Sequence, residues 1–383
     1  MKAFFTTFPA YGHLLPMLPL ARAAAAAGDE VIVVASEELH GTDDGLAMRA
    51  LKPSLPDILA ENGRRYGQDV VGYRVDNSAL IEETVALFTT TRADLALDEL
   101  CRLAEAERPD VIVAEMWDYL APMVARRLGI PWVSFTHSPA TPVDGALEGG
   151  MVRAMEQHGL ATVPDRLANV QMWPDWLESE PRAPRTPHGP DPETTIEIGT
   201  AAYNTSAVAD IPAFPGDRPT VLVTLGTVVQ DPELLDAAIR GVLDAGADAL
   251  VTAGFTTRPE DVAGDADRVR AVPFVPIGQL LDRVQAVVAA GGSGSTMAAL
   301  SRGLPVAFVP RIANQPLVAA SVARFGAGLV CDDPAELTGA VKALLNEPEL
   351  RARAAAAAEL LDQRPTPATV WSTLRDRVAA ITR

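Results

Sequence analysis

Apolar runs alternate with amphipathic stretches along most of this chain. Short runs that are apolar throughout are typical of strands in a buried parallel sheet, and apolar residues spaced three or four apart are typical of the helices that cover it. In the first half this pattern predicts strands at 3–7, 30–35, 110–114 and 131–135 and helices at 14–27, 79–107 and 119–128. Alternation of this kind predicts an α/β fold with a parallel sheet.

The same alternation restarts at residue 220, after a weakly periodic stretch at 206–219 that holds three prolines and one glycine. It predicts strands at 221–225, 249–253, 269–272, 284–289, 305–309 and 328–331 and helices at 232–245, 277–283, 315–325, 334–346 and 348–363. Residues 136–195 break the rhythm, and we expect loops with short helices there.

Two doubly wound, Rossmann-like domains that face a central cleft follow from this organisation. We expect an N-terminal domain at 1–205, a linker at 206–219, a second domain at 220–365 and a C-terminal helix at 366–383 that packs back on the first domain.

Composition narrows the class of protein. The chain has 383 residues, 48% of them hydrophobic, and a net charge of −18. That charge argues against nucleic acid or an anionic membrane as partner, because both need a surplus of Lys and Arg. We expect no signal peptide and no transmembrane helix, so the expected location is cytoplasmic. Cys101 and Cys331 lie far apart and are expected to be buried and unpaired.

A glycine-serine loop at 290–296 (Ala-Gly-Gly-Ser-Gly-Ser-Thr) follows a predicted strand and precedes a helical stretch. Backbone N–H groups at such a helix start, together with the helix dipole, favour a phosphate or diphosphate. The loop lacks the Lys of a Walker A motif, and Met297 stands where a dinucleotide fingerprint has its third glycine. No pair of histidines has the spacing of metal ligands, so no metal is predicted.

The longer stretch 274–328 contains Phe-Val-Pro-Ile-Gly-Gln before the loop and Pro-Arg-Ile-Ala-Asn-Gln after it. It resembles the donor-binding signature of inverting, nucleotide-sugar-dependent glycosyltransferases of the two-Rossmann-domain (GT-B) type. The nearest likeness is to bacterial enzymes that attach deoxysugars to antibiotic aglycones. Residues 9–16 (Pro-Ala-Tyr-Gly-His-Leu-Leu-Pro) and 223–227 (Val-Thr-Leu-Gly-Thr) match further motifs of that family.

The resemblance implies a role for each matching residue. His13 matches the general base, and Glu115, which ends a predicted strand, stands where the family has Asp; Asp118 is the alternative partner of His13. The residues that match donor-binding positions are Gly226, Thr227, Phe274, Val275, Gly292, Ser293, Gly294, Ser295, Asn314 and Gln315. Two departures weaken the donor site: Ala290 replaces a diphosphate-binding His, and Asn314 replaces an Asp.

Four residues, Phe88, Met116, Trp117 and Tyr119, either line an apolar acceptor pocket or belong to the core. The remaining histidines (His40, His137, His158 and His188) are interpreted as surface or acceptor-side residues.

The resemblance therefore implies metal-independent, inverting transfer of a deoxysugar to a hydroxyl of a hydrophobic natural-product aglycone. The resemblance implies no cofactor, and the nucleotide diphosphate sugar that donates the sugar is a co-substrate. A thymidine diphosphate (dTDP) sugar is favoured over a UDP sugar because Ala298 replaces a carboxylate that contacts ribose in some relatives. A non-catalytic homologue that binds nucleotide weakly is the alternative, and a nucleotide-sugar epimerase is a third reading. The sugar, the aglycone, the linkage and the oligomeric state, a homodimer included, stay open.

Overall fold

The computed structural model divides into two compact units, and each is described by itself. The first unit comprises residues 1–199 and 364–383, and the second comprises residues 200–363. The structure describes residues 1–42, 45–67, 80–178, 193–205, 209–211, 213–226, 231–254, 258–265 and 267–381. Among these, no helix combines the length and apolarity needed to cross a membrane. Both cysteines are buried and unpaired, as expected.

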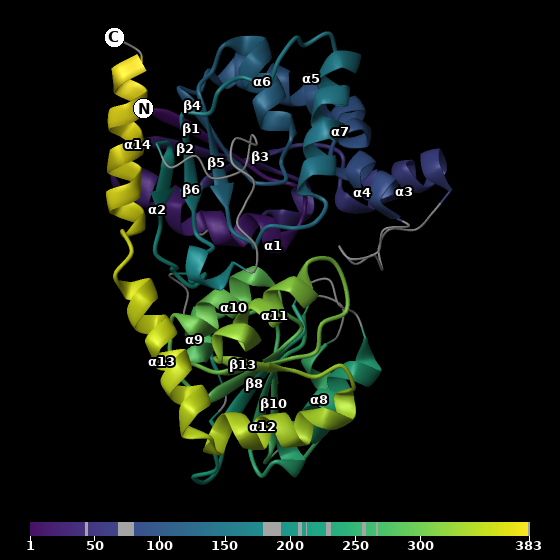
Figure 1. Ribbon diagram of the computed structural model, residues 1–383, viewed down its shortest axis with the longest axis vertical. Coiled ribbons are helices and arrows are strands. Elements are labelled where there is room, and N and C mark those ends of the chain that lie inside the picture. The colour runs from purple at the N-terminus through teal and green to yellow at the C-terminus, as the bar shows by residue number, and fades with distance from the viewer. Residues whose placement is uncertain are drawn as a thin grey trace. The chain divides into compact units, whose positions relative to one another are not determined.

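A parallel sheet forms the middle layer of the first unit (Figure 1). Its described strands lie in the order β3-β2-β1-β4-β5-β6-β7. Their bounds are β1 (Lys2–Thr6), β2 (Glu30–Ala35), β3 (Ala47–Ala50), β4 (Val111–Glu115), β5 (Trp132–Thr136), β6 (Ala168–Gln171) and β7 (Thr195–Glu197). Since the chain leaves β1 toward β2 and later returns to its other side at β4, the sheet has a switch point there, where ligands of doubly wound folds bind.

Helices cover both faces of this sheet. Their bounds are α1 (Tyr11–Leu14), α2 (Leu18–Ala26), α3 (Leu55–Tyr66), α4 (Ile81–Phe88), α5 (Thr90–Glu107), α6 (Leu120–Leu128), α7 (Asp144–Gln157) and α14 (Pro367–Ile381). Helices α2 and α14 pack together on one face, and α5, α6 and α7 lie on the other (Figure 1). An apolar cluster that includes Phe4, Ile112 and Leu97 fills the space between the sheet and the second group.

Three expectations for this unit are corrected. The helix predicted at 79–107 breaks at Thr89, whose hydroxyl donates to the carbonyl of Val85 and whose backbone leaves the helical region. The helix predicted at 14–27 is divided by a 3-10 turn at Leu15–Met17. Residues 136–195 hold more than loops and short helices, because they contribute the 14-residue α7 and the strand β6, and β7 begins at Thr195.

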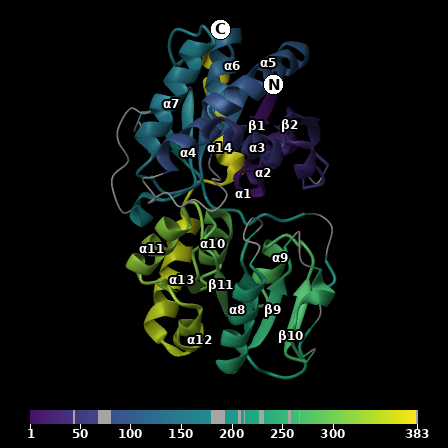
Figure 2. The same cartoon turned by 90° about the vertical axis from the view of Figure 1, so that its right-hand side faces the viewer.

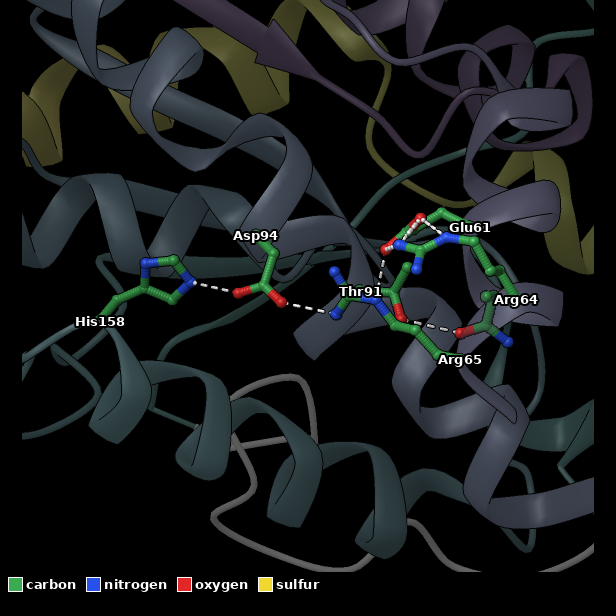
Figure 3. A network of polar contacts seen from close by, with 7 residues as sticks. Glu61, Arg64, Arg65, Thr91, Asp94 and His158 are labelled. Atoms are coloured by element: carbon green, nitrogen blue, oxygen red, sulfur yellow. Dashed lines mark hydrogen bonds and ion pairs between the residues drawn. The ribbon is translucent and has the colours of Figure 1, made fainter. Parts of the chain in front are cut away.

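Polar contacts join α3, α5 and α7 at the surface of the first unit (Figure 3). Arg65 donates to Asp94 over 2.6 Å, and the other carboxylate oxygen of Asp94 lies 3.1 Å from Nε2 of His158. Beside them the hydroxyl of Thr91 donates to the amide oxygen of Asn62 inside the buried region. Exposed ion pairs stabilise a fold by only about 0–1 kcal/mol each, so we interpret this network as one that orients the three helices.

The second unit has its own parallel sheet, in the order β10-β9-β8-β11-β12-β13 among its described strands (Figure 2). The strands are β8 (Thr220–Thr224), β9 (Asp248–Thr252), β10 (Val269–Val272), β11 (Ala286–Ala289), β12 (Val306–Phe308) and β13 (Gly328–Val330). The helices are α8 (Pro232–Asp244), α9 (Gly278–Leu281), α10 (Ser293–Leu300), α11 (Gln315–Phe325), α12 (Leu337–Asn346) and α13 (Pro348–Asp362). Helices α8 and α12 pack together, while α10 contacts α9, α11 and α13.

The last helix, α14, is fixed to the first unit through a buried carboxylate. Asp29 accepts from the amino group of Met1 over 2.9 Å and from the indole N–H of Trp371 over 2.7 Å. Just before α14, Arg364 donates to the backbone carbonyl of Gln171 over 2.8 Å. The C-terminal segment therefore belongs to the same packed unit as the N-terminus.

Replacing Trp371 with Phe tests this anchor. The variant keeps an aromatic ring but removes the N–H that Asp29 accepts, and an under-satisfied buried group costs about 1–3 kcal/mol. We expect the free energy of unfolding in urea titrations to fall by that amount. Asp376→Asn, at an exposed position on the same helix, serves as control. Equal stability of the Phe variant and the wild type would contradict the anchor.

Candidate active site

Three adjacent strands of the first unit, β1, β4 and β5, carry the central polar residues at or just beyond their carboxyl ends. His13 follows β1 and lies on α1, Glu115 is the last residue of β4, and His137 directly follows β5. Because β4 lies between β1 and β5, the strand order places the glutamate between the two histidines.

The carboxylate of Glu115 is completely buried, with 0% of its side chain exposed. Its Oε1 lies 3.0 Å from Nδ1 of His13 and accepts the backbone N–H of Phe8 over 3.3 Å. Its Oε2 lies 3.3 Å from Nε2 of His137 and accepts the backbone N–H of Trp117 over 3.0 Å. Each oxygen thus faces one imidazole nitrogen and one backbone amide.

The surroundings of Glu115 favour its ionised form. Burial by itself would raise the pKa of the carboxyl group. The charge of His13 and the hydrogen bonds from His13 and His137 outweigh that effect and hold the pKa of Glu115 well below its usual range. A carboxylate that stays charged behind an imidazole can stabilise the imidazolium form of that ring.

His13 is the more accessible histidine, with 14% of its side chain exposed. Its backbone N–H donates to the carbonyl of Ala10, and Ala10 is the N-cap residue of the short helix α1. Since Nδ1 faces Glu115, Nε2 is the ring nitrogen that can accept a proton from another molecule. This is the arrangement that a general base requires.

Asp118 does not contact His13 and pairs instead with a buried arginine. Its Oδ1 lies 3.3 Å from Arg92, which also donates to the backbone carbonyl of Thr7 over 2.7 Å. The guanidinium carbon of Arg92 lies 5.0 Å from the centre of the Phe8 ring. Of the two carboxylates considered for His13, Glu115 is therefore the one beside it.

The four aromatic and sulfur-containing residues expected at the acceptor site are all buried in the core cluster of the first unit. Two of them also face His13: the ring of Trp117 lies 5.2 Å and that of Phe88 lies 6.3 Å from its imidazole. Phe8 joins them at 5.4 Å. Met116 and Tyr119 are each 2% exposed and belong to the core cluster, which agrees with the interpretation of these two residues as core.

In the second unit, the glycine-serine loop joins β11 to α10, which begins at Ser293 with Gly292 as its cap. The helix thus starts four residues earlier than the pattern indicated. Gly291 has a φ of +99°, and a Cβ added there would lie 2.8 Å from the backbone oxygen of Gln315. The glycine-serine loop and the segment after β12 therefore touch, and only glycine fits where they do.

The other donor-side residues lie beyond neighbouring strands of the same sheet. Gly226 follows β8 with a φ of +81°, and Thr227 lies outside the described residues. After β10, the Phe274 ring lies 6.2 Å from that of Tyr203, and Val275 is buried.

The side chain of Gln315 points toward the segment that directly precedes α11. Its side-chain oxygen accepts the backbone N–H groups of Arg311 and Ile312 over 2.9 and 3.1 Å. The amide NH₂ of Gln315 is then the end of that side chain that can donate to a ligand. Asn314, directly before it, occupies the N-cap position of α11, without a capping hydrogen bond from its side chain.

His137 is the residue to which the sequence analysis assigned no specific role. Of its two readings, surface or acceptor-side, the surface reading is wrong, because the side chain is only 3% exposed and lies 3.3 Å from Glu115. The sequence did contain a signal for His137, because this residue comes shortly after a predicted strand, just as Glu115 ends one. His158 contacts Asp94 at the surface, His40 is half-buried, and His188 lies outside the described residues.

The two histidines and Glu115 have ligand atoms within 4.8 Å of one another, a spacing that a divalent ion could also use. Local spacing in the sequence did not indicate this cluster, because three separate strands bring it together. Each Glu115 oxygen faces two nitrogens; the contact with Nε2 of His137 is a hydrogen bond, and the contact with Nδ1 of His13 is an ion-pair distance of 3.0 Å.

Two Rossmann-like parallel-sheet units, one with a histidine-carboxylate pair and one with a glycine loop at a helix start, form the architecture of the GT-B class. The chain belongs to the erythromycin biosynthesis protein CIII-like family: the N-terminal domain model of that family matches residues 22–226 and the C-terminal domain model matches residues 233–376.

Known proteins agree with this assignment. The chain is 29% identical to L-demethylnoviosyl transferase of Streptomyces niveus, over 97% of this chain and 96% of that protein. It is 31% identical to the elloramycin glycosyltransferase ElmGT of Streptomyces olivaceus, over 98% and 97%. The crystal structure of the Streptomyces sp. SF2575 glycosyltransferase SsfS6 with thymidine diphosphate superposes with a TM-score of 0.81 at 25% identity, over 98% of this chain and 99% of that one.

The low pKa of Glu115 gives a pH-dependent prediction for Glu115→Gln. The unfolded carboxyl group titrates near ~4.3, so the stability that ionised Glu115 adds is complete above that pH and is lost as pH falls toward the lower native pKa. The difference in unfolding free energy between wild type and variant should shrink by about 1.4 kcal/mol per pH unit below ~4.3.

Urea titrations at about pH 7 and about pH 3.5 measure this difference. Glu105→Gln, which replaces an exposed carboxylate on α5, is the matched control. A Glu115 difference that is the same at both pH values would contradict the assignment of a buried, ionised carboxylate.

Proposed function

We propose that this protein transfers a deoxysugar from a dTDP-sugar to a hydroxyl of a hydrophobic natural-product aglycone, with inversion at the anomeric carbon and without a metal ion. The observation that carries the proposal is the distance of 3.0 Å between Nδ1 of His13 and the buried Glu115 carboxylate.

The acceptor hydroxyl is the group that His13 activates. Its O–H bond breaks, the proton moves to Nε2 of His13, and the oxygen forms a bond to the anomeric carbon. The bond from that carbon to the diphosphate oxygen breaks on the opposite side, which inverts the configuration. Glu115 keeps the proton of the resting imidazole on Nδ1 and stabilises the imidazolium that forms.

The leaving diphosphate needs positive potential as the bond to the sugar breaks. Backbone N–H groups at the start of α10, at Ser293 to Ser295, offer it together with the helix dipole, and no ion is required for this step. Gly226 and the NH₂ group of Gln315 are further contacts that we assign to the donor. Ala290 stands where the family resemblance implies a diphosphate-binding His, so we assign the contacts to the diphosphate to these groups instead.

Support for the substrates comes from the relatives and from the rings around His13. The structure of SsfS6 was solved with thymidine diphosphate, which favours dTDP as the carrier. The elloramycin glycosyltransferase is a natural-product enzyme by name. Phe8, Phe88 and Trp117 surround the imidazole with apolar area, which suits an aromatic or macrocyclic acceptor.

A non-catalytic homologue that binds nucleotide weakly is the second candidate, and Ala290 and Asn314 are the residues that favour it. The buried carboxylate behind His13 favours the enzyme, because an inactive protein has no need of an oriented imidazole. A nucleotide-sugar epimerase is the third candidate, and an isomerised donor formed without any acceptor would identify it.

His13→Ala tests the base. We expect turnover to fall by at least ~10³-fold, because the proton of the substrate hydroxyl loses the imidazole that we propose accepts it. Binding of dTDP should remain. Steady-state transfer assays and calorimetry measure the two quantities. His158→Ala removes a surface histidine of the same unit and should leave the rate unchanged. A His13 variant with near wild-type turnover would show that the base is elsewhere.

Gly291→Ala tests the diphosphate loop. An added Cβ would meet the backbone oxygen of Gln315 at 2.8 Å, and the φ of +99° is strained for alanine. Calorimetry should give tighter binding of dTDP than of UDP to the wild type, and at least ~10-fold weaker dTDP binding to the variant. Gly339→Ala, which has open space around its Cβ, is the control. Absence of binding to both nucleotides by the wild type would favour the non-catalytic homologue.

A further inference from the structure

We propose that His137 is a positioning residue for this reaction: acting through Glu115, it holds the imidazole of His13 in the orientation and tautomer that accept the acceptor proton. The functional unit is then a His-Glu-His triad. This inference rests on the proposed function for its kinetic test, but the geometry behind it is independent of the substrate.

The contacts around the glutamate are symmetrical. His13 approaches one carboxylate oxygen and His137 approaches the other, at 3.0 and 3.3 Å. The centres of the two imidazole rings lie 5.6 Å apart with the rings edge to face, so they also contact each other directly. The polar link between His137 and His13 is the carboxylate of Glu115, and the double-mutant cycle below separates it from the ring contact.

The backbone that carries His137 is held firmly. The carbonyl of Thr136, directly before it, accepts the backbone N–H groups of Met172 and Trp173 over 2.8 and 3.3 Å. The hydroxyl of Thr136 donates to Asn169 over 2.8 Å. Both contacts tie the end of β5 to β6 and the residues that follow it. A side chain on such a support can fix its partner with the precision that catalysis requires.

Glutamate has more need of this support than aspartate. Its side chain has one more rotatable bond, and a buried carboxylate with too few donors is costly. Without His137, Oε2 would keep only the backbone N–H of Trp117. The carboxylate could then rotate away from Nδ1 of His13, and the imidazole would lose the contact that selects its tautomer.

The chemistry of the partner also matters. A neutral imidazole donates a hydrogen bond without cancelling the charge that Glu115 needs in order to stabilise an imidazolium at His13. An arginine in that place would cancel it. The buried arginine of this region, Arg92, forms its ion pair with Asp118, whereas the oxygens of Glu115 lie within contact distance of His13 and His137.

The test compares His137→Leu with His137→Gln. Leu has no donor, whereas the side-chain nitrogen of Gln can reach the position of Nε2. We expect kcat to fall on the order of 10²-fold in the Leu variant, the cost of a misplaced catalytic group, and to recover for the most part in the Gln variant. The KM for the donor and the Kd for dTDP should not change, and circular dichroism checks that both variants fold.

A double-mutant cycle with Glu115→Gln separates positioning from simple packing. If His137 acts through the charged carboxylate, His137→Leu should cost much less in the Glu115→Gln background than in the wild type. Costs that add, a Leu variant as fast as wild type, or a Gln variant as slow as Leu would each overturn the proposal.

A substrate-free readout distinguishes this proposal from the proposed function. The chain has 5 histidines, so their ring nitrogens can be assigned by ¹⁵N NMR. We expect neutral His13 to carry its proton on Nδ1 in the wild type and to populate both tautomers in the Leu variant. An unchanged tautomer would overturn the role of His137 even if transfer is observed. A wild type with this tautomer but no transfer activity would contradict only the proposed function.

Discussion

A single buried negative charge at the end of β4 links the fold of the first unit to its chemistry. An ionised carboxylate without solvent contact is stable in a protein only when several donors surround it. The four groups around Glu115 come from the segments that follow β1, β4 and β5. They meet because these strands are neighbours in the order β1-β4-β5. The strand order that makes the sheet doubly wound is thus also what makes the charge stable.

The second unit offers backbone N–H groups rather than charged side chains at its glycine-serine loop. The N–H groups at the start of α10 are donors of the kind that bind an anion, and in our proposal that anion is the diphosphate of the donor. The turn before them depends on Gly291, because the backbone of Gln315 leaves no room for a side chain. The position before this glycine, Ala290, does carry a side chain.

Much of this arrangement could be predicted from the sequence, because its signals are local. His13 and Glu115 each follow an apolar run, and the carboxyl ends of parallel strands lie at one edge of a sheet. The position of His137 depends on which strands are neighbours, which the apolar pattern does not state. Strands β6 (Ala-Asn-Val-Gln) and β7 (Thr-Ile-Glu) were missed because polar residues interrupt them. The break at Thr89 was missed because it arises from one hydroxyl contact.

Glu115 stands where the family resemblance implies an aspartate, and the same geometry shows what its longer side chain contacts. Its carboxylate lies 3.0 Å from His13, which follows β1, and 3.3 Å from His137, which follows β5. A glutamate side chain has one more rotatable bond than an aspartate side chain, so its orientation needs more support. Backbone N–H groups from Phe8 and Trp117 restrict it from one direction, and the two rings restrict it from the other. The carboxylate is thus held from two directions, and in our proposal the contact from His137 sets the orientation in which it faces His13.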